Sequence, residues 1–171
     1  LLALLLWIAA PLSAFAGAAL IAAGALHLAR LARWAGDRTF AEPLVTVLHA
    51  GYAFLPIGAL LLGAAILWED ALGRTAAQHL WTGGAIGMMT LAVMTRATLG
   101  HTGRALRASG ATVAIYAALA ISVLARVATA LWPQEAMLLY AVSAILWLLA
   151  FAGYAAVYGP SLLRRPPAKA G

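Results

Sequence analysis

Histidines and arginines supply the side chains in this sequence that could bind a metal ion or an anion. Seven of them lie in or beside long apolar runs: His27, His49, His79, His101, Arg96, Arg104 and Arg126. Ionisable residues inside a membrane span are costly and are commonly functional. The chain has no cysteine, so a metal here would need histidine, methionine or oxygen ligands. Histidine without cysteine or an intramembrane acid favours haem or copper over zinc hydrolysis.

His49 is the first candidate metal ligand. It lies six residues after Pro43, about 9 Å along a helix. Tyr52, Pro56 and Gly63 fall on nearly the same helical face, and this stripe would face protein or a cofactor. The alternative is a histidine that only forms a hydrogen bond across helices.

His79, the second candidate ligand, precedes a glycine-rich run. Gly83 shares its helical face, and Gly83 and Gly87 are four residues apart, a spacing that lets another helix come close or leaves room for a flat ring. Arg126 lies inside the fourth apolar run, with Ser122 roughly on its face. Arg126 could snorkel to the surface or neutralise a buried anion near His79.

His101, the third candidate ligand, lies just beyond the third apolar run, where Gly100 is predicted to be the left-handed cap of the helix. Arg96 and Arg104 lie nearby in the sequence. They either mark the inner membrane interface or neutralise an anionic cofactor edge, such as haem propionates, with His101 as ligand or propionate partner. His27 is interpreted as an interfacial residue rather than a ligand.

The elements that must position these residues are membrane spans. Of the 171 residues, 65% are hydrophobic and 9% are charged, and the mean hydropathy is +0.95. This composition predicts an integral membrane protein with an all-α fold, a polytopic transmembrane helical bundle that forms one domain. Five runs suit spans of about 20 apolar residues: residues 6–28, 44–68, 76–99, 111–131 and 136–158.

Other classes of function are disfavoured by what the sequence lacks. It has no paired carboxylates, Walker glycine loop or Ser-His-Asp set, which argues against a hydrolase or a nucleotide-binding protein. The net charge of +6 is scattered over the ends of the apolar runs. This distribution indicates a topology signal rather than nucleic-acid binding.

The positive charges predict the orientation in the membrane. Cytoplasmic loops retain Lys and Arg, and nine of the 11 cations fall in the first loop, the third loop and the tail: Arg30, Arg33, Arg38, Arg96, Arg104, Arg107, Arg164, Arg165 and Lys169. We therefore predict that the loops around Asp37 and Gly103 are cytoplasmic, and those around Asp70 and Gln134 periplasmic. The N-terminus of the segment is then periplasmic and its C-terminus cytoplasmic. Short loops also predict antiparallel neighbouring helices.

Two stretches resemble the NnrS family of polytopic membrane proteins: "LHAGYAFLPIGALLL" (48–62) and "HLWTGGAIGMMTLAVMTRATLGHTGRAL" (79–106). The shared features are Leu-His followed by Gly-Tyr and Leu-Pro-x-Gly, then a His-led glycine-rich helix that ends in Met-x-Arg and Leu-Gly-His-Thr-Gly-Arg. The resemblance carries over five positions by motif: His49, His79, His101, Arg96 and Arg104.

The resemblance implies a protein of the bacterial inner membrane that contains haem and copper and is associated with denitrification and resistance to nitric oxide. The family's N-terminal half, with its own His-x-His-Glu motif, does not appear in this sequence. We therefore expect a C-terminal segment whose partners are the lipid bilayer, nitric oxide or a related small molecule, and the missing half. That half should supply some of the ligands.

Depth in the membrane divides the candidate ligands into two sites. From His79 to Leu99 a helix rises about 30 Å, so one metal with His bonds of about 2 Å cannot join His79 to His101. We predict an inner site with His49 and His101 near Arg96 and Arg104, and an outer site with His79 near Arg126. The expected cofactors are a b-type haem and copper.

Two other functions are compatible with the same residues. Pro56 and the membrane-embedded Arg126 also suit a transporter or permease subunit without a redox cofactor. Alternatively, the segment is a structural half that supports a metal site in the missing part, and its histidines only form hydrogen bonds.

Overall fold

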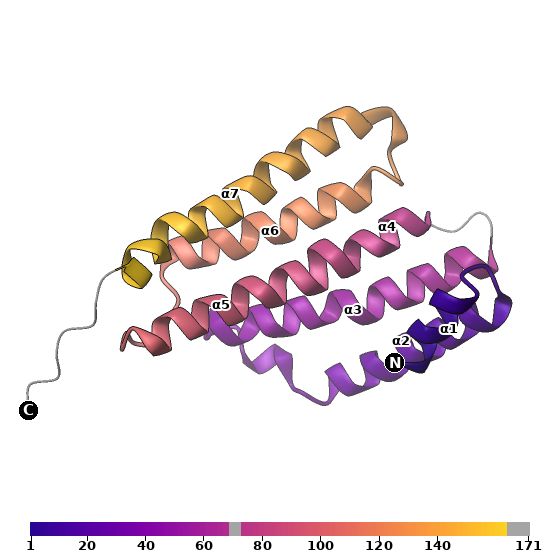
Figure 1. Ribbon diagram of the computed structural model, residues 1–171, viewed down its shortest axis with the longest axis horizontal. Coiled ribbons are helices and arrows are strands. Elements are labelled where there is room, and N and C mark those ends of the chain that lie inside the picture. Colours follow the sequence, from indigo (N-terminus) through magenta and orange to yellow (C-terminus); the bar gives the residue numbers. More distant parts are fainter. Residues whose placement is uncertain (69–72, 164–171) are drawn as a thin grey trace, which may run out of the picture.

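The computed structural model describes residues 1–68 and 73–163, and within these ranges the chain is helical and contains no β-strand (Figure 1). The predicted all-α bundle is confirmed. Four helices in the described residues are long and apolar enough to cross a membrane: α2 (Ala14–Ala32), α3 (Pro43–Leu67), α6 (Gly110–Ala128), and α7 (Ala136–Leu163) with the preceding turn η3 (Pro133–Glu135).

A fifth long rod is built from three consecutive segments. The helix α4 (Arg74–His79) continues without a break into the π-helix η2 (Leu80–Gly87) and then into α5 (Met88–His101). We call this rod helix 74–101. It agrees with the predicted third span, so the expectation of about five spans is confirmed.

The predicted first span, residues 6–28, is wrong in its bounds. The short helix α1 (Leu2–Ala9) ends before Pro11, and α2 begins only at Ala14. Proline disfavours helical backbone in the residue before it, and Ser13 then caps the new helix by accepting the Ala16 N–H at 3.1 Å. The first apolar run is therefore a short helix and a separate spanning helix.

The long helices lie side by side, with helix 74–101 and α3 in the middle (Figure 1). α2 packs on α3, α1 packs on α2, and α6 and α7 form a pair against helix 74–101. Consecutive rods are antiparallel, as the short loops predicted. α2 and α5 end, and α3 and α6 begin, at what we call the His101 end; the opposite end is the His79 end.

Some of the topology assignments lie outside the described residues. These are the loop around Asp70 and the tail cations Arg164, Arg165 and Lys169.

Close packing between α2 and α3 depends on glycine. A Cβ at Gly63 would lie 2.7 Å from the Gly17 carbonyl oxygen, and one at Gly24 would lie 3.0 Å from the Pro56 carbonyl oxygen. Small residues let membrane helices approach this closely, where van der Waals packing holds them together. The α2–α3 pair therefore cannot accept a side chain at Gly63 without moving apart.

At the His101 end, α5, α6 and α7 share an apolar core and two interhelical hydrogen bonds. Leu91 and Leu119 are fully buried there. The hydroxyls of Thr98 and Tyr154 lie 2.9 Å apart, and those of Thr112 and Tyr158 lie 2.6 Å apart. Such bonds add modest stability between membrane helices, about 0.6 kcal/mol on average.

The end of α5 differs from the prediction that Gly100 is its left-handed cap. The helix continues through Gly100 to His101, and the left-handed residue is Gly103, with φ +67°. The N–H of Arg104 donates to the Leu99 carbonyl at 2.9 Å, and the N–H of Gly103 donates to that of Gly100 at 3.2 Å. This is the bond pattern of a Schellman motif, and it places His101 in the last helical turn.

We expect Gly63→Ala to lower the free energy of unfolding by about 1–3 kcal/mol, because an added methyl group meets backbone that cannot yield. Gly100→Ala is the matched control, since nothing lies within 4 Å of a Cβ there, and it should gain about 0.5–1 kcal/mol from helix propensity. Unfolding followed in detergent measures both. Equal stabilities of the two variants would contradict this packing.

Candidate functional site

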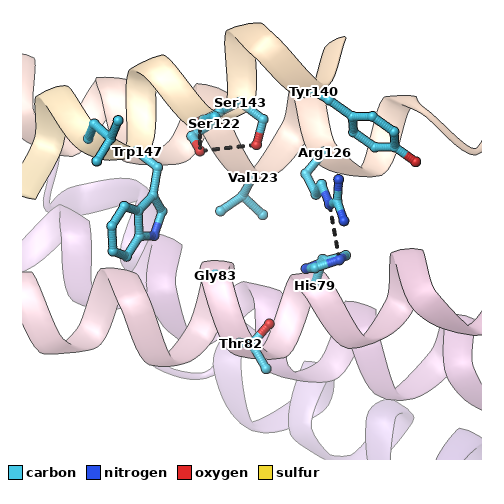
Figure 2. Close-up of a pocket in the computed structure, with 11 residues that line it drawn as sticks. His79, Thr82, Gly83, Ser122, Val123, Arg126, Tyr140, Ser143 and Trp147 are labelled. Carbon is cyan, nitrogen blue, oxygen red and sulfur yellow. Dashed lines mark hydrogen bonds between the residues drawn. The ribbon is translucent and has the colours of Figure 1, made fainter. Parts of the chain in front are cut away.

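A cavity of about 620 Å³ lies at the His79 end, between η2 of helix 74–101 and the α6–α7 pair (Figure 2). It is lined by His79, Thr82, Gly83, Ser122, Val123, Arg126, Tyr140, Ser143, Ala144, Trp147 and Leu148. His79 faces Arg126 at one side of the cavity, whereas Val123 and Trp147 line another part of it (Figure 2).

The pair of His79 and Arg126 is the central contact of this cavity. The Arg126 Nε donates a hydrogen bond to the His79 Nε2 at 3.0 Å. An imidazole nitrogen that accepts a hydrogen bond carries no proton, so the ring is neutral and its proton is on Nδ1. The two residues meet, as their predicted depths required. Their roles toward a cofactor stay predictions.

The Arg126 side chain also lies over an aromatic ring. Its guanidinium carbon lies 4.3 Å from the centre of the Tyr140 ring, a favourable cation–π arrangement. No carboxylate lines the cavity in the described part of the chain. A positive charge with only a neutral imidazole and an aromatic face beside it favours an anion or a hydrogen-bond acceptor as ligand.

The two serines of the cavity are already engaged with the protein. The Ser122 hydroxyl donates to the Ser143 carbonyl at 2.7 Å, and both serines are buried. This bond joins α6 to α7 behind the cavity. Arg126 and His79 keep donors for a ligand, and so do the Tyr140 hydroxyl and the Trp147 indole N–H. Val123 and Leu148 supply apolar walls.

Glycines in the π-helix shape the wall that carries His79. Gly83 and Gly87 both face α6, where added Cβ atoms would lie 3.1 Å from Val123 and 3.6 Å from Leu119. The tightest glycine of this run is Gly84, where a Cβ would lie 2.5 Å from Phe54 of α3. The sequence prediction singled out Gly83 and Gly87 but not Gly84, which lets α3 support the wall from behind.

His49 lies in a different place, at the His101 end beside a cavity of about 360 Å³ that Asp37 also lines. Its Nδ1 is 3.1 Å from the Val45 carbonyl oxygen, and because a carbonyl only accepts, Nδ1 carries the proton. The lone pair is then on Nε2. A histidine that donates one N–H to a backbone carbonyl and offers its other nitrogen has the arrangement common among metal ligands.

The remaining predicted site residues lie at the surface of the same end. His101 and Arg104 are exposed and Arg96 is half-buried, and none of the three lines the cavity beside His49. In residues 1–68 and 73–163, no three or more His, Asp or Glu residues gather in a way that could hold a metal ion. The described residues therefore offer single imidazoles rather than a complete coordination sphere.

Comparison with known families decides the identity of the chain. The family model described as "NnrS protein" matches residues 1–165. The chain belongs to the NnrS family. It is thus a multi-pass membrane protein, linked to nitric oxide at the level of the family. The chain matches no curated protein and no solved structure.

One contact of this NnrS-family chain was missed at the sequence level. The Nδ1 of His27, interpreted there as interfacial, lies 2.6 Å from the Tyr52 hydroxyl oxygen. Trp34 packs against Tyr52 and also presents an edge-to-face contact to His49. The position of Tyr52 one turn after His49 was visible in the sequence. Its partner on α2 was not, because periodicity does not fix how two helices are rotated against each other.

A double-mutant cycle tests the His79–Arg126 contact. We expect His79→Phe and Arg126→Met to show a coupling of about 0.6 kcal/mol or more in unfolding free energy, since about 0.6 kcal/mol is the average for hydrogen bonds between membrane helices and this bond has a charged donor. The Thr98→Val and Tyr154→Phe cycle provides a reference for a second interhelical bond. Additive effects of His79→Phe and Arg126→Met would show that the two side chains do not interact.

Proposed function

We propose that this NnrS-family chain binds a b-type haem and copper, and that the protein binds or processes nitric oxide in the bacterial inner membrane. The observation that carries the proposal is the cavity at His79 and Arg126. This cavity is lined by the imidazole of His79, the guanidinium of Arg126 and apolar side chains, and no carboxylate in the described residues lines it. A haem combines the matching parts: a metal that takes an imidazole, an apolar ring and anionic propionates.

The residues of the cavity fit a haem by size and chemistry. Its volume of about 620 Å³ is within the range of about 300–1,000 Å³ that is usual for ligand sites. Arg126 would hold a propionate, and Val123 and Trp147 would pack on the ring and exclude water. His79 would bind the iron through the Nε2 that now accepts from Arg126. When bound, the haem would supply an iron that takes nitric oxide.

The bond between His79 and Arg126 would link two contacts with a haem, that of Arg126 with a propionate and that of His79 with the iron. While the guanidinium donates to Nε2, the lone pair that would bind iron is occupied. The guanidinium would be held more strongly by an anionic propionate than by a neutral imidazole, because two opposite charges then attract each other. With a haem bound, Arg126 would hold the propionate and the Nε2 of His79 would be available to the iron.

We propose His49 as the copper ligand. Its Nε2 carries the free lone pair, and imidazole suits copper. Asp37 lines the same cavity, and residues outside this segment would have to supply the remaining ligands. His49 and His79 lie at opposite ends of the bundle, so they would serve separate sites. His101 would assist at the His49 end, where Arg96 and Arg104 would offset anionic charge.

The metal content of the full-length protein tests this assignment. We expect His79→Ala to lose haem and keep copper, and His49→Ala to lose copper and keep haem, because each removes a ligand from one site only. Gln78→Ala is the control, since Gln78 is exposed beside His79. Haem is measured by pyridine haemochrome and copper by mass spectrometry.

Two outcomes would contradict the proposal. If both histidine variants lost the same single metal and kept all others, there would be one site rather than two. If His49→Ala, His79→Ala and His101→Ala all kept full haem and copper, the segment would be a structural half without ligands.

We further propose the orientation that the cations predicted, with Gly103 cytoplasmic and Gln134 periplasmic. Support comes from Arg96, Arg104 and Arg107, which gather around Gly103. In the full-length protein with its other cysteines removed, an impermeant thiol reagent added to spheroplasts should label Gln134→Cys and not Gly103→Cys. The opposite labelling pattern would reverse the orientation.

A further inference from the structure

Tyr52 and His27 form a short hydrogen bond that the proposed haem and copper sites do not use. The Tyr52 hydroxyl oxygen lies 2.6 Å from the His27 Nδ1, and the two rings meet edge to face at 5.8 Å. Tyr52 is on α3 and His27 is on α2, and both are half-buried at the His101 end. A phenol and an imidazole this close form a ready pair for proton transfer, because imidazole accepts protons near neutral pH.

Trp34 links this pair to the surface. It lies just after α2, its side chain is 41% exposed, and its ring centre is 4.6 Å from that of Tyr52. The Arg30 guanidinium carbon lies 5.2 Å from the centre of the Trp34 ring. Trp34, Tyr52 and His27 therefore form a row of neighbouring rings that starts at an exposed position.

We propose that Tyr52 is a redox-active tyrosine, with His27 as its proton acceptor. A one-electron oxidant takes an electron from the phenol, while the phenolic proton moves to His27 Nδ1. The products are a neutral tyrosyl radical and an imidazolium. With nitrogen dioxide as the oxidant, which forms when nitric oxide meets oxygen, nitrite is the reduced product. One electron and one proton leave Tyr52, and both are accounted for.

His27 distinguishes Tyr52 from the other tyrosines. The hydroxyls of Tyr154 and Tyr158 pair with threonine hydroxyls, which are not bases. Tyr116 has a buried hydroxyl without a hydrogen-bond partner among the described residues, and Tyr140 packs against the Arg126 cation. Without a base, one-electron oxidation leaves a cation on the ring, which is costly in an apolar interior.

Arg30 favours transfer of oxidation from Trp34 to Tyr52 along this row of rings. Trp34 is the first of these rings that a dissolved oxidant reaches, and its oxidation creates a radical cation. The guanidinium over its face repels that positive charge, so the charge is more stable on Tyr52, where release of the proton neutralises it. The row thus carries oxidation away from the surface and ends at the Tyr52–His27 pair.

Flash photolysis of the full-length protein in lipid nanodiscs tests the tyrosine assignment. Photogenerated ruthenium(III) tris(bipyridine) is the oxidant, and the neutral tyrosyl radical is followed by its absorption and its electron paramagnetic resonance spectrum. We expect Tyr52→Phe to remove the fast-forming radical. Tyr154→Phe is the matched control and should keep it, because Tyr154 lacks an imidazole partner. An unchanged radical in Tyr52→Phe would overturn the proposal.

The role of His27 has its own readouts. His27→Phe should slow formation of the radical at least about tenfold, as expected for loss of a positioned base, and added imidazole should restore part of the rate. The wild-type protein should form the radical more slowly in D₂O, which tests the proton transfer even where His27→Phe does not fold. Equal rates in H₂O and D₂O would contradict proton transfer to His27.

The choice of nitrogen dioxide rests on the proposed link to nitric oxide, whereas the tyrosine assignment does not. Haem and copper content are measured separately in the same variants. Normal formation of the Tyr52 radical in a protein that binds no metal would contradict only the proposed haem and copper function. Normal metal content without the Tyr52 radical would contradict only the proposal that Tyr52 is redox-active.

Discussion

The cost of a guanidinium inside a membrane span is the constraint on which the site depends. Arg126 belongs to the last turns of α6, and the described lining of its cavity has no carboxylate to neutralise it. The structure offsets this cost with two uncharged partners, the Nε2 of His79 and the face of Tyr140. These partners come from helix 74–101 and from α7, so one cation of α6 contacts both neighbouring helices beside a cavity that favours an anion.

The scaffold behind the cavity is held by close contacts rather than by charge. Glycines bring α2 against α3, and Gly84 brings α3 against the π-helix that follows His79. The Ser122–Ser143 bond fixes α6 against α7 on the other side. π-Helical turns are uncommon and frequently occur at functional sites. The one here lies at the start of the wall that faces Arg126, which fits a site that is positioned from both sides.

Much of this arrangement follows from the sequence because depth in a membrane can be counted. The lengths of the apolar runs and the alternating charge of the loops predicted the helices and their directions. The depth of each residue in the membrane then predicted that His79 lies near Arg126. Rotation about the helix axes could not be counted. The His27–Tyr52 bond and the contact of Gly84 with Phe54 depend on that rotation. The predicted bounds of the first span were wrong for a local reason. Pro11 and the Ser13 cap divide an apolar run that is continuous in hydropathy.

We propose that the cavity lined by His79 and Arg126 holds a haem in the assembled protein. A cryo-electron microscopy map of the full-length protein, purified with its haem, tests it most directly. We expect haem density in this cavity, with His79 bound to the iron and the Arg126 guanidinium in contact with a propionate. A haem located elsewhere, with the hydrogen bond between Arg126 Nε and His79 Nε2 intact, would contradict it.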